Sequence, residues 1–312
     1  MSRKKLLGGL VLTSIAATVF LSTPFGLQTV LKAERLASGL SDQSTLVNET
    51  FWTWSEKGQS AEPLVLLHGF AGNRNHWVRV TRQLGASHRI LIPDLPGFGD
   101  SSPIADDPEF GVDIQLTRLI QWLDALGLKK VHIGGHSMGG RLAFLFASRY
   151  PDRVKSLYLM CPSGITQGRD SAFHRKLNET GINLATPIDL DEFDALNELA
   201  FEDMPWIPRP LYYQLGHDLL EQRPRLIEIW DDLKQPAMSL ELLTASLPAI
   251  PITTLWGAED RLLNPSVLRL FKSALPEMRD ELLPGIGHMP LIEAPTRVAE
   301  SISGHLNTQS SQ

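Results

Sequence analysis

The sequence predicts an α/β protein with a mostly parallel central sheet, helices on both faces of that sheet and an inserted helical cap. Short segments rich in Val, Ile and Leu alternate with amphipathic helical segments along most of the chain, which is typical of parallel strands joined by crossover helices. A glycine-flanked serine, in GHSMG at residues 135–139, lies between one such strand and the following helix. Between residues 163 and 247 the alternation stops, and proline-rich amphipathic segments take its place.

Each expected element follows from its own pattern. The expected strands are short, apolar and bounded by turn residues, and they lie at 48–55, 64–67, 89–95, 130–133, 154–160, 252–256 and 279–283. The expected crossover helices have one apolar face, and they lie at 75–84, 112–126 and 141–150. We therefore expect an N-terminal segment and spacer at 1–40, a core at 41–162 and 248–308, and a helical cap at 163–247.

Composition limits the classes of function. The 312 residues are 43% hydrophobic, which is ample for a large core and a smaller cap. The formal net charge is −6, and because the first 35 residues are basic, the remainder is still more acidic and a poor nucleic-acid binder. Cys161 is the single cysteine, which excludes an intrachain disulfide and a cysteine-rich metal site, and its apolar neighbours predict a packing role.

The amino terminus has the pattern of a membrane signal. Three basic residues at positions 3–5 precede an uncharged run at 6–31, of which 6–21 is the most apolar part. A run this long can cross a bilayer core, which needs about 20 residues, and no small-x-small cleavage site follows it. We expect a single-pass N-terminal anchor with the rest of the chain on the extracytoplasmic side. The alternative is a signal peptide whose cleavage releases a secreted protein.

Ser137 is the candidate nucleophile, because GHSMG has the form of a nucleophile elbow, GxSxG. In such an elbow, a sharp strand-to-helix turn brings the chain so close to itself that the residues two before and two after the serine must lack side chains. Gly135 and Gly139 meet this requirement.

A serine nucleophile needs a base and an acid that orients the base. His288 is the expected base, because the glycine-flanked GIGHMP at 285–290 follows the last strand. Asp260, at the end of WGAED, is the expected acid, and Glu259 is its rival. His136 is expected to pack behind the nucleophile. Structural positions are expected for the histidines in a strand, in the cap and in the terminal helix: His132, His174, His217 and His305.

The oxyanion of the tetrahedral intermediate needs two main-chain donors. Met138 follows the candidate nucleophile at a helix start, and Phe70 lies in HGFAG directly after a buried strand. We expect the N–H groups of Phe70 and Met138 to form the oxyanion hole. No metal ligand set is expected.

From about residue 63 to residue 306 the chain resembles α/β-hydrolases of the lipase and esterase branch. The matching motifs LLHGF, PDLPGFGDS, GHSMGG, WGAED and GIGHMP stand in the order of that family. Within the fold, the N-terminal anchor, HGF, SMGG and MCPSG make the chain most similar to membrane-anchored monoacylglycerol lipases, the α/β-hydrolase domain protein six group, and to related bacterial lipases. The resemblance implies hydrolysis of monoacylglycerol or other lipid esters through an acyl-enzyme on Ser137, without a cofactor. It also implies that Ser137, Asp260 and His288 form the triad.

Other functions of this fold fit less well. Haloalkane dehalogenases and epoxide hydrolases of this fold use an aspartate where this chain has Ser137. Carbon-carbon bond hydrolases share the serine and are the runner-up, but in them a tryptophan usually follows the catalytic histidine, where this chain has Met289. A non-catalytic, membrane-tethered binding protein is the alternative from another class, and the complete set of expected catalytic positions counts against it.

Overall fold

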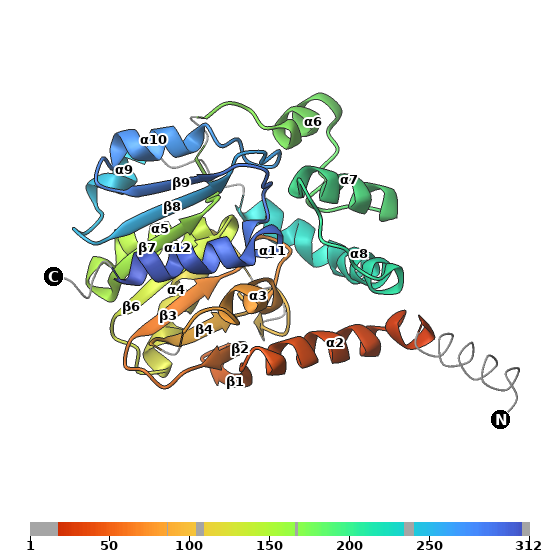
Figure 1. Cartoon of the computed structure of the whole chain (residues 1–312), viewed down its shortest axis with the longest axis horizontal. Helices are drawn as coiled ribbons and strands as arrows, with labels where there is room; N and C mark the ends of the chain where they lie inside the picture. The colour runs from red at the N-terminus through yellow and green to blue at the C-terminus, as the bar shows by residue number, and fades with distance from the viewer. Residues whose placement is uncertain (1–17, 86, 104–108, 166–167, 234–239, 308–312) are drawn as a thin grey trace, which may run out of the picture.

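The computed structural model describes residues 18–85, 87–103, 109–165, 168–233 and 240–307. Its centre is a sheet with strand order β1-β2-β4-β3-β6-β7-β8-β9, in which β5 also pairs with β2 (Figure 1). The strands are β1 Ser41–Val47, β2 Thr50–Lys57, β3 Pro63–Leu67, β4 Arg89–Pro93, β5 Ser102–Pro103, β6 Val131–His136, β7 Val154–Met160, β8 Ile252–Gly257 and β9 Arg279–Leu283.

The sheet is parallel from β4 to β9, as the alternating pattern predicts. In its register Leu67 pairs with Gly135 and His136 pairs with Met160, so the carboxyl ends of β3, β6 and β7 lie side by side. The loops that follow these strands therefore converge at one edge of the sheet, where open α/β sheets place their ligand sites.

The first part of the sheet differs from the prediction. The strand expected at 48–55 is the second arm of an antiparallel hairpin, β1–β2, whose turn places Asn48 at φ 51°. The sequence pattern missed β1 because this strand lies at the edge of the sheet and most of its residues are polar and exposed, so it has no apolar alternation.

Helices cover both faces of the sheet. The helices of the core are α3 Val78–Thr81, α4 Val112–Ala125, α5 Met138–Arg149, α9 Leu240–Ala245, α10 Val267–Ala274, α11 Pro290–Glu293 and α12 Pro295–Asn307, with 3₁₀ turns η1 Arg74–Trp77 and η2 Pro151–Arg153. The helices α3 and α12 contact each other, whereas α4, α5, α9 and α10 form a separate chain of contacts. Figure 1 shows α12 in front of the strands and α5 behind them.

The predicted cap interval contains α6 Ala172–Thr180, α7 Leu190–Ala200 and α8 Arg209–Leu233, which stand to one side of the sheet (Figure 1). The helix α8 continues through Pro224. The last helix of the interval, α9, packs instead against α5 and α10 of the core.

The predicted membrane anchor lies partly outside the described residues, which begin at Thr18. The described part is not one continuous apolar helix. Thr23 caps a new helix, α2 Pro24–Ala37, by accepting a hydrogen bond from Gly26 N, and proline at the first helical position favours this break. In the part of the chain that the structure describes, no helix has the length and apolarity needed to span a membrane.

The helix α2 belongs to the folded body, which corrects the expectation of a spacer after the anchor. Leu27 is buried, and α2 contacts α8 of the cap. At the other end of α2, buried Arg35 donates to Asp42 and to Asn75 at 2.6 Å. The uncharged run at 6–31 therefore ends within a helix that packs against the catalytic body.

Candidate active site

Ser137 lies at the turn between β6 and α5 in the backbone geometry of a nucleophile elbow, with φ 53° and ψ −115°. A Cβ atom on Gly135 would come within 2.2 Å of the main chain of Gly139, and a Cβ on Gly139 would come within 2.4 Å of the main chain of His68. These contacts are the steric reason for the two flanking glycines. The positive φ strains a serine and presents its side chain at the sheet edge.

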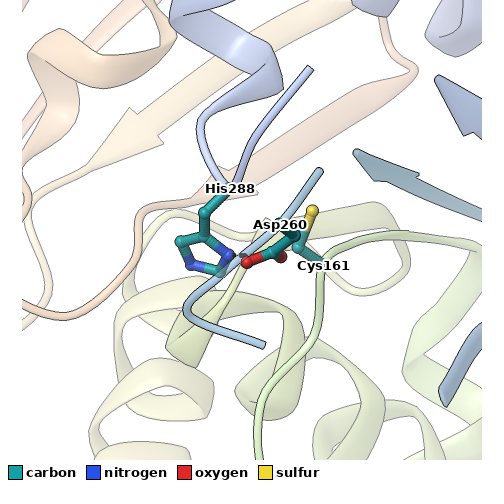
Figure 2. A group of neighbouring side chains, drawn as sticks. All are labelled: Cys161, Asp260 and His288. Carbon is teal, nitrogen blue, oxygen red and sulfur yellow. Dashed lines mark hydrogen bonds and ion pairs between the residues drawn. The ribbon is translucent and has the colours of Figure 1, made fainter. Parts of the chain in front are cut away.

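His288 and Asp260, separated by 28 residues in the chain, meet through a hydrogen bond between His288 Nδ1 and Asp260 Oδ2 at 2.7 Å. Both side chains are buried. Figure 2 shows the imidazole and the carboxylate pointing toward each other from two different loops. Because a carboxylate only accepts, Nδ1 carries the proton, which leaves Nε2 with the lone pair that a general base needs.

The structure separates the two candidate acids. Asp260 also accepts hydrogen bonds from Trp256 Nε1 at 3.0 Å and, through its other oxygen, from the main-chain N–H groups of Leu262 and Leu263. Glu259 points elsewhere and accepts from Ile286 N at 3.1 Å. The geometry therefore favours Asp260 as the acid that orients His288.

Cys161 lies beside this pair. Its Sγ, a carboxylate oxygen of Asp260 and a ring nitrogen of His288 all lie within 4.8 Å of one another (Figure 2). Burial raises the pKa of the thiol well above its usual value, and the neighbouring Asp260 carboxylate raises it further. The fully buried position of the thiol agrees with the predicted packing role.

The loop after β3 brings the expected oxyanion donors to the candidate nucleophile. A Cβ on Gly69 would lie 3.2 Å from Ser137 Cβ, so the main chain of this loop lies against the candidate nucleophile. Phe70 is the next residue of the loop. Met138 is the first residue of α5, and its N–H therefore has no acceptor within the helix. Phe70 and Met138 thus both lie at this edge of the sheet, and their N–H groups remain the expected oxyanion donors.

His68 holds the same loop. Its Nδ1 donates to Gly69 O at 2.8 Å, and its Nε2 accepts from Leu95 N at 2.9 Å. Burial lowers the pKa of His68 to about 3, so the ring stays neutral and keeps the lone pair that Leu95 needs. His68 is therefore a structural support for the Phe70 loop.

His136 directly precedes Ser137 and also contacts His288. Its Nε2 donates to the main-chain oxygen of His288 at 2.7 Å, and the two rings are 4.8 Å apart. Burial, with a smaller contribution from His288, lowers the pKa of His136 well below its ordinary value. His136 is therefore neutral, and its hydrogen bond to the main chain of His288 supports the loop that carries His288.

Asp94 lies directly after β4, and its side chain is bonded to Arg74 and to Asp100. Its buried carboxylate accepts from the main-chain N–H of Arg74 at 2.6 Å and from Asp100 N at 2.8 Å. The guanidinium of Arg74 pairs with the same carboxylate and with Asp100. These contacts tie the loop after β4 to the loop that follows Phe70.

A second serine-histidine pair lies in the core, away from these loops. Ser156 Oγ is 2.9 Å from His305 Nε2 and 2.9 Å from His132 Nδ1, and all three residues are buried. None of the three lines the cavity described below. This network satisfies polar groups inside the fold, which agrees with the structural positions predicted for His132 and His305.

A cavity of about 740 Å³ opens at the candidate nucleophile. Ser137, His288, Phe70 and Met138 all line it. Much of its wall is apolar and comes from the cap, including Phe193, Leu196, Ile207, Leu215, Leu219 and Trp230. The sequence pattern missed one wall, which α2 supplies through Leu27, Gln28 and Leu31, because a helix inside an apolar run gives no signal of where it packs.

The fold and this site define the class of protein. Residues 62–295 match the family model for the alpha/beta hydrolase fold, so the chain belongs to that family, as its motifs predict. It is 30% identical to lipase 1 of Psychrobacter immobilis, over 88% of this chain and 86% of that lipase. It is 26% identical to human monoacylglycerol lipase ABHD6, over 77% of this chain and 73% of that protein.

Among solved structures, the chain is similar to a membrane phospholipase A described as a bacterial virulence factor. The TM-score is 0.87 at 30% identity, over 98% of this chain and 99% of that one. These relatives confirm the prediction of an enzyme of the lipase and esterase branch.

Proposed function

We propose that the chain is a serine hydrolase that cleaves carboxylic esters of lipids, monoacylglycerols among them, through an acyl-enzyme on Ser137. The observation that carries this proposal is that one apolar cavity is lined by Ser137, at an elbow, and by His288, which is hydrogen-bonded to Asp260. The lipase relatives support an ester substrate rather than a carbon-carbon bond.

The proposed reaction has two steps. His288 Nε2 takes the proton of Ser137 as its oxygen attacks the ester carbonyl, and Asp260 holds the ring and stabilises the imidazolium. The N–H groups of Phe70 and Met138 stabilise the oxyanion. The imidazolium then gives its proton to the leaving alcohol. In the second step His288 activates a water molecule that hydrolyses the acyl-enzyme.

The cavity supports an apolar acyl chain as part of the substrate. Cap residues such as Leu196, Ile207 and Leu215 supply apolar surface, and burying an acyl chain gains about 0.8 kcal/mol per CH₂ group. Affinity is therefore expected to rise with acyl length until the cavity is filled.

Membrane attachment through the apolar N-terminal segment, with the catalytic body on the extracytoplasmic side, is part of the same proposal. The basic residues at 3–5 and the similarity to a membrane phospholipase A support it.

The test is a hydrolysis profile on p-nitrophenyl esters and monoacylglycerols of graded chain length, with Ser137→Ala as the matched inactive protein. The parent should hydrolyse them, with a KM that falls as the acyl chain lengthens. The variant should remain folded and lose turnover, because it lacks only the attacking oxygen. Parent-like turnover by folded Ser137→Ala would refute the assignment of the nucleophile. A parent that cleaves no ester would refute the proposed function.

A further inference from the structure

The carboxylate of Glu293 connects both sides of His288 to the cap. It accepts a hydrogen bond from Gly287 N at 3.0 Å and from Met289 N at 3.3 Å, the residues on either side of His288. The same carboxylate accepts from Glu202 N at 2.9 Å and from Asp203 N at 3.1 Å. These two residues follow α7 of the cap and lie about 90 positions earlier in the chain.

The cap segment at residues 200–203 touches the histidine loop directly as well. His288 N donates to Ala200 O at 2.7 Å. A Cβ on Gly287 would lie 2.7 Å from Ala200 O and 2.8 Å from Glu202 N, so the two main chains can approach this closely only because residue 287 is glycine. The main chain of the loop that carries His288 is thus bonded directly to the cap segment at 200–203, in addition to its contact with His136.

The loop that carries Asp260 is joined to the same segment from the other side. Arg261 Nη1 donates to Phe201 O at 3.1 Å, and its guanidinium pairs with the side chain of Glu202. Arg261 Nη1 also donates to Glu198 O in the last turn of α7 at 2.7 Å. The cap segment is therefore bonded to the neighbours of both Asp260 and His288. A displacement of this segment would therefore change the positions of both Asp260 and His288.

We propose that Glu293 is a positioning residue for His288, and that it makes the position of His288 depend on the cap segment at 200–203. Several N–H groups converge on this one carboxylate, and hydrogen bonds to a charged acceptor are stronger than those to a neutral one. The expected effect of Glu293 on kcat rests on the proposed function. Its expected effect on the hydrogen bond between His288 and Asp260 does not.

The first test is Glu293→Gln, which keeps the size of the side chain but replaces one accepting oxygen by an NH₂ group that faces N–H donors. On a short, water-soluble ester, kcat should fall on the order of 10- to 100-fold, as expected for a catalytic group displaced by a fraction of an ångström to 1 Å. KM should stay within about twofold. The matched control is Glu300→Gln, on the exposed face of α12, which should leave both constants unchanged.

A readout that does not need turnover keeps this proposal separate from the proposed function. The low-field proton resonance of the His288 Nδ1–H, bonded to Asp260, should shift or broaden in Glu293→Gln and not in Glu300→Gln. If the parent hydrolyses no ester, this resonance still decides between the variants.

The second variant, Gly287→Ala, leaves the Glu293 carboxylate intact but pushes the cap segment away from the histidine loop. It should give the same fall in kcat and the same change in the resonance, and it decides the question if Glu293→Gln does not fold. A purely structural role would lower Tm yet leave the resonance, and the kcat of the folded protein, at the parent values. That outcome in either folded variant would overturn the proposal.

Discussion

The indole Nε1–H of Trp256 donates to Asp260 Oδ2 at 3.0 Å, and this is the same carboxylate oxygen that accepts the hydrogen bond of His288. Trp256 is fully buried at the end of β8, and its side chain also lines the cavity. The Trp256 indole therefore holds Asp260 Oδ2 toward the imidazole of His288. The orientation of the Asp260 carboxylate thus depends on Trp256, four positions earlier in the chain.

Trp256→Phe should lower kcat roughly 10-fold with little change in KM, because a hydrogen bond to a charged group is worth about 1.5–3 kcal/mol and the carboxylate keeps its other donors. Steady-state kinetics on a short ester measure both constants. The control is Trp52→Phe, since Trp52 is equally buried and its Nε1 has no hydrogen-bond partner in the described structure. Both variants should lose stability from reduced packing. An equal loss of kcat in both would contradict the role of the Trp256 indole.

Asp260→Asn should lower kcat by a factor on the order of 10⁴, because asparagine cannot hold the His288 tautomer that carries its proton on Nδ1. Glu259→Gln should stay within a few-fold of the parent, because the Glu259 carboxylate bonds only to the main chain of Ile286 in the described structure. Both are measured as kcat on the same ester. The reverse ranking would show that Glu259 is the acid.

Replacing Ser137 by glycine should give a more stable inactive protein than replacing it by alanine. The strain of a non-glycine residue at φ 53° costs about 1–3 kcal/mol, and the extra freedom of glycine in the unfolded chain offsets only about 0.5–1 kcal/mol of that. Denaturant unfolding compares the two variants. At Ser273, within helix α10, the order should be the opposite, since alanine is the better helix former. If Ser137→Ala were the more stable of its pair, the elbow would carry no strain.

Stability should fall as the pH decreases through the acid range, because buried histidines must become charged. Burial lowers the pKa of both His68 and His305 from 6.5 to about 3, so below pH 6.5 the unfolded chain binds protons that the folded chain does not. Their contribution is fully present above pH 6.5 and is lost progressively toward pH 3. Melting curves over this range should show a shallower fall in Tm for His305→Gln than for the parent. An equally steep fall would mean that His305 is protonated in the folded protein.

A chain that begins at Leu40 should be less stable than one that begins at Thr18, because it lacks α2 and the hydrogen bonds of Arg35 to Asp42 and Asn75. It should also show a higher KM for long-chain esters, since the side chains of α2 form one wall of the cavity. Both chains should hydrolyse a short ester. Equal Tm and equal chain-length preference would show that α2 contributes nothing to the body.

Features that depend on neighbours along the chain could be predicted from the amino-acid sequence. Most strands and helices follow from periodicity, and the elbow follows from the steric limits that place glycine two residues before and two after Ser137. The exposed strand β1 and the cap interval were less predictable, because polar edge strands and proline-containing helices such as α8 violate those local patterns.

Contacts between distant groups could be found only in the folded structure. Asp260 and Glu259 are adjacent and chemically alike, so only the direction of each side chain after β8 shows that Asp260 reaches His288. Likewise, only the packing of α2 against α8 turns part of an apolar run into a wall of the cavity, and only the folded cap brings Glu202 to Glu293. These contacts join segments tens of residues apart, and their geometry is set by how the layers pack rather than by any local preference of the chain.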